Sequence, residues 1–240
     1  MDKHTVEKIK EELKKRALIL SFIPFVILGL VAILIALTAK GPENVDVFKE
    51  YYDSKVIEFA TENDYLSDAD IAFIGDSITD GYEPFGAAYS QYKVAWRGIG
   101  GDTTTGVYNR LEVSLYAVNP KVVVLLIGVN NLDSMFTDYE RIITDICAKL
   151  PEAKLIVQSL HPTSKDFSSR NAKILDANKQ IKEICERNGC TYVDMYAQLV
   201  NSEGVYAEEY TDDGLHPNEK GYERITEILL PIIAEKLASK

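Results

Sequence analysis

The chain has 240 residues, 46% of them apolar and 26% charged, with a formal net charge of -11. This composition is typical of one globular domain plus an extra segment, and it excludes a low-complexity or repetitive chain. An acidic chain cannot replace the counterions of nucleic-acid phosphates, so we expect no nucleic-acid partner. The three cysteines form no CxxC pair and no His/Asp/Glu cluster has ligand spacing, so we expect neither metal nor cofactor.

An uncharged apolar stretch, "ALILSFIPFVILGLVAILIAL", covers residues 17–37. A helix of this length spans roughly 30 Å, the thickness of a bilayer's hydrocarbon core, so the stretch predicts one transmembrane helix. Residues 1–16 carry six Lys or Arg and residues 38–58 only three. The excess of positive charge predicts a cytoplasmic segment at 1–16 and an extracytoplasmic location for everything after residue 37, in a single-pass protein of the cell membrane.

Two other interpretations of the apolar stretch stay open. A cleaved signal peptide has a shorter apolar core, of about 7–15 residues, and small residues before the cut. A cut after Ala39 would place Leu37 at the minus-three position, which fits poorly. A buried core helix is the third interpretation, and an uncleaved anchor is the one that we favour.

A polar linker is expected at residues 38–46, followed by one domain at 47–240. Apolar residues within 45–62 have helical spacing, which predicts an amphipathic helix docked on this domain. From residue 70 onward, short apolar runs alternate with helical patterns. The runs predict strands at 70–75, 93–101, 121–128, 153–160 and 190–195, and the patterns predict helices at 103–117, 136–149, 170–188 and 218–238.

Strands that are apolar on both faces and alternate with helices indicate a sheet covered on both sides. The expected fold is therefore a three-layer α/β/α sandwich with a five-stranded, mostly parallel sheet. In such sheets the carboxyl ends of the strands carry the working site. Small or polar residues follow three of the predicted strands, and a fourth polar loop lies near the end of the chain: "GDS" from 75, "GGDT" from 100, "GVNN" from 128 and "DDGLHPNEKGY" from 212.

These four loops resemble the sequence blocks of the SGNH hydrolases, the GDSL-type esterases and lipases. The matching residues are "GDSITDG", "GIGGDTT", "IGVNN" and "DGLHP", in that order, between about 70 and 222. The resemblance implies a flavodoxin-like SGNH fold and an enzyme that acts on ester bonds. The sequence departs from the pattern at Trp96, where relatives often have Asn.

The resemblance also implies a role for each matching residue. Ser77 is the implied nucleophile, His216 the general base, and Asp213 the carboxylate that orients His216. The backbone N–H groups of Ser77 and Gly101, with the side-chain amide of Asn130, are the implied oxyanion hole.

The chemistry of these side chains agrees with the implied roles. A serine hydroxyl is a weak nucleophile until a base takes its proton, and imidazole suits that task near neutral pH. Asp213 lies three positions before His216, so a tight turn can bring its carboxylate to the ring, whereas Asp212 is expected to be solvated. Taken alone, Ser77 is also a good helix N-cap, because it follows a strand and precedes a helical pattern.

Two further side chains are candidates for substrate binding. His161 stands at a predicted strand end, and Trp96 lies in the second block; either could line the substrate pocket. The alternatives are an ordinary loop residue for His161 and a core aromatic for Trp96.

The expected function is that of a membrane-anchored extracytoplasmic serine esterase that forms an acyl-enzyme on Ser77. Short acyl esters of carbohydrate, such as acetyl esters on a glycan, are the first expectation for its substrate. A lysophospholipase or other lipid acyl esterase and an O-acyltransferase to a sugar hydroxyl are the alternatives. A binding module without catalysis is the alternative outside enzymes, although such a module needs no such set of residues.

Overall fold

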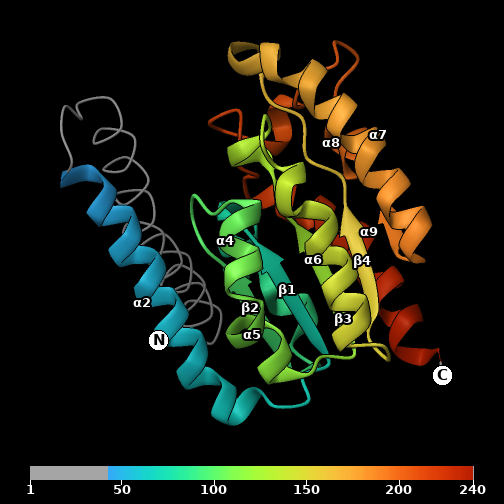
Figure 1. The fold of residues 1–240 in the computed structure, drawn as a ribbon. Coiled ribbons are helices and arrows are strands. Elements are labelled where there is room, and N and C mark those ends of the chain that lie inside the picture. Colours follow the sequence, from blue (N-terminus) through green and yellow to red (C-terminus); the bar gives the residue numbers. More distant parts are fainter. Residues whose placement is uncertain (1–42, 240) are drawn as a thin grey trace, which may run out of the picture. The chain divides into compact units, whose positions relative to one another are not determined.

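The computed structural model describes residues 43–239 of the chain, and side chains from residue 48 onward. This part contains a five-stranded sheet with the strand order β2-β1-β3-β4-β5, in which every pairing is parallel (Figure 1). The five strands are β1 Ile71–Gly75, β2 Val94–Gly98, β3 Val122–Leu126, β4 Lys154–Gln158 and β5 Thr191–Val193.

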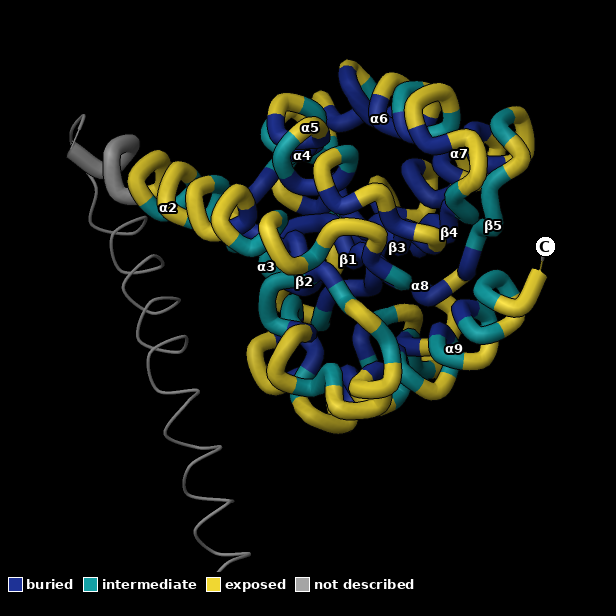
Figure 2. Tube along the Cα trace, turned by 90° about the horizontal axis from the view of Figure 1, so that it is seen from below, coloured by how far each residue is buried: buried dark blue, intermediate teal, exposed yellow. Residues whose placement is uncertain are grey.

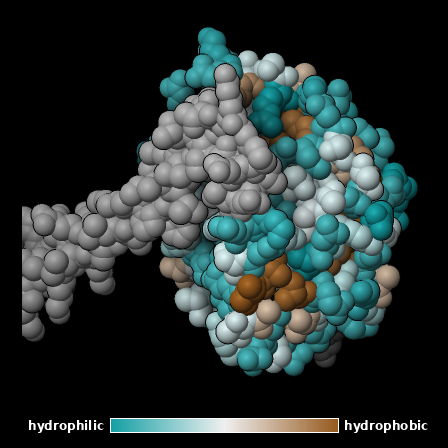
Figure 3. Space-filling view, turned by 60° about the vertical axis from the view of Figure 1, so that its left-hand side comes forward, coloured by the Kyte–Doolittle hydropathy of each residue, from teal (hydrophilic) through white to brown (hydrophobic). Residues whose placement is uncertain are grey.

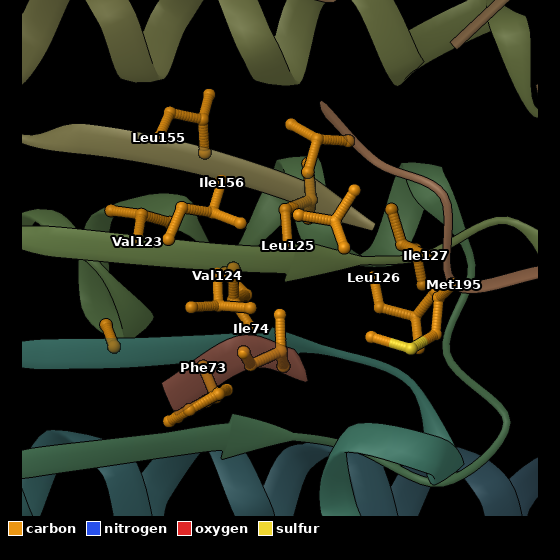
Figure 4. Close-up of a cluster of buried hydrophobic side chains, with 14 of the residues drawn as sticks. Phe73, Ile74, Val123, Val124, Leu125, Leu126, Ile127, Leu155, Ile156 and Met195 are labelled. Atoms are coloured by element: carbon orange, nitrogen blue, oxygen red, sulfur yellow. The ribbon is translucent and has the colours of Figure 1, made fainter. Parts of the chain in front are cut away.

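The strands form because short β-branched and aliphatic runs bury both faces of a sheet. Every residue of β1 and β3 is buried. Figure 4 shows side chains of β1, β3 and β4 packed together, among them Phe73, Val124 and Ile156. The register aligns Gly75 with Gly98 on one side and with Leu126 on the other, so these three strands end at the same edge of the sheet.

Helices cover both faces of the sheet. One face carries α4 to α7 and the other carries α9, with the buried strands between them (Figures 1 and 2). The helices on these faces include α4 Thr104–Asn109, α6 Phe136–Lys149, α7 Asn171–Asn188 and α9 Glu219–Ala238. The helices of four or five residues are α3 Ser77–Asp80, α5 Leu111–Ser114 and α8 Met195–Leu199. The expected α/β/α sandwich is thus confirmed, with a sheet that is parallel throughout.

The surface seen in Figure 3 is largely hydrophilic, with small apolar patches. The large apolar side chains that are exposed in the described part are Phe48, Ile57, Tyr65, Phe167 and Leu175. This distribution agrees with the high charged fraction of the sequence.

Two boundaries differ from the sequence-based expectation. The helix expected at 103–117 breaks at Arg110, whose backbone is not helical and whose side chain is buried. Helix α2, Glu43–Leu66, begins earlier than expected, so the last four residues of the linker predicted at 38–46 are helical. From Tyr51 onward this helix belongs to the same compact unit as the sheet.

The transmembrane helix expected at 17–37 and the cytoplasmic segment expected at 1–16 lie outside the described residues. Between residues 43 and 239, none of the helices combines the length and the apolar character that crossing a membrane requires.

Candidate active site

Ser77 is the first residue of helix α3, directly after strand β1. The residue that caps this helix is Asp76, whose Oδ1 accepts a hydrogen bond of 3.1 Å from the N–H of Ile78. A cap needs only one such side chain, so the hydroxyl of Ser77 is not used for it. Gly75 lets this turn form, because a Cβ there would lie 2.1 Å from the carbonyl oxygen of Leu126.

Ser77, His216 and Asp213 form a continuous chain of hydrogen bonds. The Oγ of Ser77 lies 3.0 Å from Nε2 of His216, and Nδ1 of His216 lies 2.6 Å from Oδ2 of Asp213. The other oxygen of Asp213 accepts the backbone N–H groups of Leu215 and His216 at 2.8 and 2.7 Å. These bonds make the tight turn that the spacing of the two residues predicts.

Asp212 takes no part in this chain. Its Oδ1 accepts a hydrogen bond of 3.0 Å from the side-chain amide of Asn218. The choice between the two neighbouring carboxylates therefore agrees with the expectation from sequence spacing.

Asp213 and His216 each stabilise the charged form of the other. Burial tends to raise the pKa of Asp213, but its hydrogen bonds to the side chain and backbone of His216 and the charge of His216 lower it to about 2. Burial tends to lower the pKa of His216, but the hydrogen bond and charge of Asp213 and the charge of Asp76 raise it above 6.5. An ionised carboxylate thus fixes the orientation and tautomer of an imidazole whose other nitrogen faces Ser77.

Asp76 is a second carboxyl beside the site, and the sequence assigns it no chemical role. Its side chain is fully buried, and Oδ2 has no hydrogen-bond partner in the described structure. Burial raises the pKa of Asp76 to about 7. In the sequence, the only indication of a role for Asp76 is its position between Gly75 and Ser77 in the first block.

Gly101 occupies a tight turn after strand β2. The N–H of Asp102 donates to the carbonyl of Ile99 at 3.1 Å, and Gly101 has a φ of 77°. A type II turn requires a positive φ at this third position, which explains the glycine. Within residues 43–239, the N–H groups of Ser77 and Gly101 have no hydrogen-bond acceptor, so both can donate to a substrate oxygen.

Asn130 lies in the short helix η3, Val129–Asn131, after strand β3. Its Nδ2 donates to the carbonyl of Asp102 at 2.8 Å, and an amide has a second hydrogen to donate. The neighbouring Asn131 has a structural role, because its side chain exchanges hydrogen bonds with the backbone and hydroxyl of Thr104.

A buried ion pair connects the loops of the site. Nε of Arg110 donates to Asp102 at 2.8 Å, and its NH2 group donates to the carbonyl of Gly75 at 2.9 Å. Asp102 in turn accepts the amide of Asn130 through its carbonyl. Sequence reasoning missed Arg110, because a single arginine on a helical pattern carries no signal of burial.

Within residues 43–239, the ring contacts of Trp96 and His161 are with aromatic side chains and not with Ser77, Asp213 or His216. The ring of Trp96 stacks on Phe73 at 4.5 Å between centroids and meets Tyr82 edge-on at 5.4 Å, within the aromatic core. His161 is 3% exposed, both of its ring nitrogens lack a partner among the described residues, and burial lowers its pKa to about 3. Trp96 is only partly buried, and a place in a substrate pocket stays a prediction for both side chains.

A hollow of about 420 Å³ adjoins Asn130. Seven of the eight side chains that line it are polar or charged: Asn130, Asn131, Asp133, Ser134, Ser169, Arg170 and Lys173, with Leu132 as the apolar member. This polar depression shares Asn130 with the candidate oxyanion hole.

A parallel α/β/α sandwich with a Ser–His–Asp chain at the carboxyl edge of its sheet is the arrangement of a serine hydrolase. Residues 73–224, more than half of the chain, match the GDSL-like Lipase/Acylhydrolase family. The chain belongs to this family, as the four sequence blocks indicate.

Solved structures share the fold at low sequence identity. A protein from Streptococcus pneumonia matches with a TM-score of 0.72 and 23% identity, over 78% of this chain and 95% of its own. A GDSL-like lipase from Bacteroides thetaiotaomicron gives 0.68 and 23%, over 75% and 97%. A variant of an acetyl xylan esterase from Geobacillus stearothermophilus gives 0.58 and 21%, over 70% and 95%. A search of the curated proteins finds no match to this chain.

Proposed function

We propose that the chain is a serine esterase that hydrolyses carboxylic esters through an acyl-enzyme on Ser77. The observation that carries this proposal is the hydrogen-bond chain from Ser77 Oγ through the imidazole of His216 to the carboxylate of Asp213. Such a chain activates a hydroxyl that is otherwise a poor nucleophile.

In the proposed reaction, Ser77 Oγ attacks the ester carbonyl while Nε2 of His216 takes the hydroxyl proton. The N–H groups of Ser77 and Gly101 and the amide of Asn130 donate to the oxyanion that develops. The carbon–oxygen bond of the ester then breaks, and His216 gives its proton to the departing alcohol. Water, deprotonated by His216, attacks the acyl-enzyme, and the acid leaves as Ser77 regains its proton.

The substrate that we propose is a short acyl ester, such as acetyl, of a carbohydrate. The hollow beside Asn130 supports this choice, because its lining offers hydrogen-bond donors and acceptors for hydroxyl groups and one apolar side chain. A long acyl chain would leave those polar groups without partners, which costs free energy. Among the structures that share the fold are acetyl xylan esterases.

A lysophospholipid or another lipid ester is the second candidate, and the apolar stretch at 17–37 favours it. We propose that this stretch anchors the enzyme in the cell membrane with the catalytic domain outside, as the positive charges of residues 1–16 indicate. An O-acyltransferase would share the first half of the reaction and pass the acyl group to a sugar hydroxyl.

One set of assays separates these candidates. The full chain is given p-nitrophenyl esters of increasing acyl length, an acetylated xylo-oligosaccharide and a lysophosphatidylcholine, and the products are analysed with and without free sugar. We expect kcat/KM to fall as the acyl chain lengthens, with acetate as the main product. A preference for long chains would favour the lipid esterase, and acyl transfer that exceeds hydrolysis would favour the transferase.

The location has its own test. Intact cells are treated with protease, and the domain is followed with an antibody to it. Digestion without lysis is expected for an extracytoplasmic domain, whereas protection until the cells are lysed would contradict the proposed orientation.

A further inference from the structure

The carboxylate of Asp80 joins three parts of the molecule: the helix that begins at Ser77, the turn that carries Gly101, and helix α2. We propose that Asp80, held in place by Tyr51 of α2, is a positioning residue for the Gly101 side of the oxyanion hole. This inference rests on the proposed function, and it adds residues that the motifs of the family do not assign a role.

The contacts of Asp80 are short and shielded from water. Its Oδ2 accepts the hydroxyl of Tyr51 at 2.5 Å and the N–H of Gly100 at 3.1 Å. Nζ of Lys55 lies 3.8 Å from Oδ1, and the side chains of Lys55 and Asp80 are only 15% and 12% exposed. Hydrogen bonds to a carboxylate are stronger than neutral ones, and burial protects them from competition by solvent.

The geometry of the turn explains why these contacts affect catalysis. Gly100 and Gly101 are the two central residues of the turn from Ile99 to Asp102. Type I and type II turns differ by a flip of the peptide between the central residues, and that peptide carries the N–H of Gly101. Two glycines in succession make both forms accessible. By holding the N–H of Gly100, Asp80 fixes the peptide that enters this turn, directly before the peptide that carries the N–H of Gly101.

Helix α2 also bonds to the helices that follow this turn, α4 and α5. The hydroxyl of Tyr52 donates to the carbonyl of Gly106 in α4 at 2.9 Å. The side-chain amide of Asn63 donates to the carbonyl of Val113 in α5 at 2.8 Å. Helix α2 is therefore linked to the chain on both sides of Gly101. Before Gly101 the link runs from Tyr51 through Asp80 to Gly100, and after it Tyr52 bonds directly to Gly106.

A second set of contacts fixes the orientation of α2. Arg97 of strand β2 is buried and pairs with Glu62, and it donates to the side chain of Asn63 at 3.2 Å. Phe59 is 1% exposed, with the guanidinium groups of Arg97 and Arg110 at 4.8 and 5.7 Å from its ring centroid. The helix thus has a defined register, which places Tyr51 against Asp80.

Helix α2 lies before the residues 73–224 that match the family. Tyr51, which holds Asp80 in place, therefore lies outside the matched region, whereas Asp80 itself lies inside it. Burial and the charge of Asp80 raise the pKa of Tyr51 above its ordinary value of 10.0, so its hydroxyl is a protonated donor at neutral pH.

The test compares full-chain variants Asp80→Asn and Tyr51→Phe with Tyr65→Phe, a matched control on the same helix whose side chain is 63% exposed. The measured quantities are kcat and KM for p-nitrophenyl acetate, the thermal midpoint, and the affinity of a trifluoromethyl ketone whose adduct places an oxyanion in the hole. Removing an oxyanion donor costs about 100- to 1,000-fold in kcat, so misplacing one is expected to cost less.

We expect kcat to fall about 10- to 100-fold in Asp80→Asn and about 3- to 10-fold in Tyr51→Phe, with KM within about twofold. The affinity of the ketone should fall in the same proportion as kcat. If Asp80 and Tyr51 only stabilised the fold, their loss would not change this affinity at temperatures below the thermal midpoint. Tyr65→Phe should match wild type. If Asp80→Asn does not fold, Tyr51→Phe carries the same test.

Wild-type kcat and ketone affinity in the folded variants would overturn the inference, as would a loss confined to KM. Ser77→Ala run in parallel separates the two proposals. If wild type turns over in a Ser77-dependent way while Asp80→Asn equals wild type, only the positioning role fails. If wild type shows no Ser77-dependent turnover, both proposals fail.

Discussion

The Oγ of Ser77 lies 3.0 Å from Nε2 of His216, although 139 positions of sequence separate the two residues. Strand β1 delivers Ser77 to the carboxyl edge of the sheet, and the turn held by Asp213 delivers the imidazole to the same place. Because Asp76 caps the helix that Ser77 begins, the serine hydroxyl is left for His216.

The pH dependence of kcat/KM should follow the titration of His216. Only the neutral imidazole accepts the proton of Ser77, so activity should fall as the pH drops through the pKa of His216, which lies above 6.5. Asp213→Asn removes the hydrogen bond and charge that raise this pKa. We expect the acidic limb to move to lower pH and kcat to fall by roughly 10³- to 10⁴-fold.

Asp212→Asn is the matched control for that prediction, because Asp212 bonds to Asn218 and not to His216. This substitution should leave the dependence of kcat/KM on pH unchanged. An acidic limb that Asp213→Asn does not move would contradict the assigned role of this carboxylate.

Asn130→Ala should lower kcat by about 100- to 1,000-fold, because it removes one donor to the oxyanion. Asn131→Ala is the comparison, since it removes two bonds to Thr104 and no proposed donor. We expect Asn131→Ala to lower the thermal midpoint more than Asn130→Ala does, and kcat less. The reverse pattern in kinetics and melting would exclude Asn130 from the oxyanion hole.

Asp76→Asn should change how stability depends on pH. The pKa of Asp76 is raised to about 7 in the folded protein, so the folded state binds more protons than the unfolded state between about pH 4 and 7. The free energy of unfolding of wild type should therefore fall as the pH rises through that window. The amide can still cap the helix but does not titrate.

Urea unfolding at pH 5 and pH 8 measures this effect. Relative to wild type, the free energy of unfolding of Asp76→Asn should be higher at pH 8 than at pH 5, by on the order of 1–3 kcal/mol. If wild type and Asp76→Asn differ in free energy of unfolding by the same amount at pH 5 and at pH 8, Asp76 is ionised in the folded protein at both pH values.

Phe59→Ala should destabilise the protein by about 3–5 kcal/mol, the usual cost of removing a fully buried aromatic ring. Ile57→Ala on the same helix is the control, because Ile57 is 67% exposed and its loss should cost no more than about 0.5 kcal/mol. Equal effects of the two substitutions in urea unfolding would mean that α2 is not packed on the sheet as described.

The sequence predicts the features that depend on local pattern. The apolar runs predict the positions of all five strands, because a short run that is apolar along its whole length is typical of a strand buried on both faces of a sheet. The resemblance of the sequence blocks to the family predicts that Ser77 and His216 lie together, and the structure places them 3.0 Å apart. The resemblance implies Asp213 rather than Asp212, and the spacing of three residues between Asp213 and His216 agrees with a tight turn.

Contacts between distant segments could not be predicted in this way. The bond from Tyr51 to Asp80 depends on the register of a helix against a sheet, which no single window of sequence contains. Arg110 breaks a helix that periodicity extends, because its ion pair with Asp102 outweighs helical propensity. Trp96 lies in the middle of β2, where its partly buried ring stacks on Phe73 of β1, a contact that spacing along the chain does not predict.

The central claim is that Ser77 is the nucleophile of an esterase, and turnover of p-nitrophenyl acetate by full-chain wild type and Ser77→Ala tests it most directly. The account predicts turnover by wild type, with kcat reduced by about 10⁶-fold, to the level of background hydrolysis, in the variant. Equal rates of p-nitrophenol release by folded wild type and folded Ser77→Ala would contradict it.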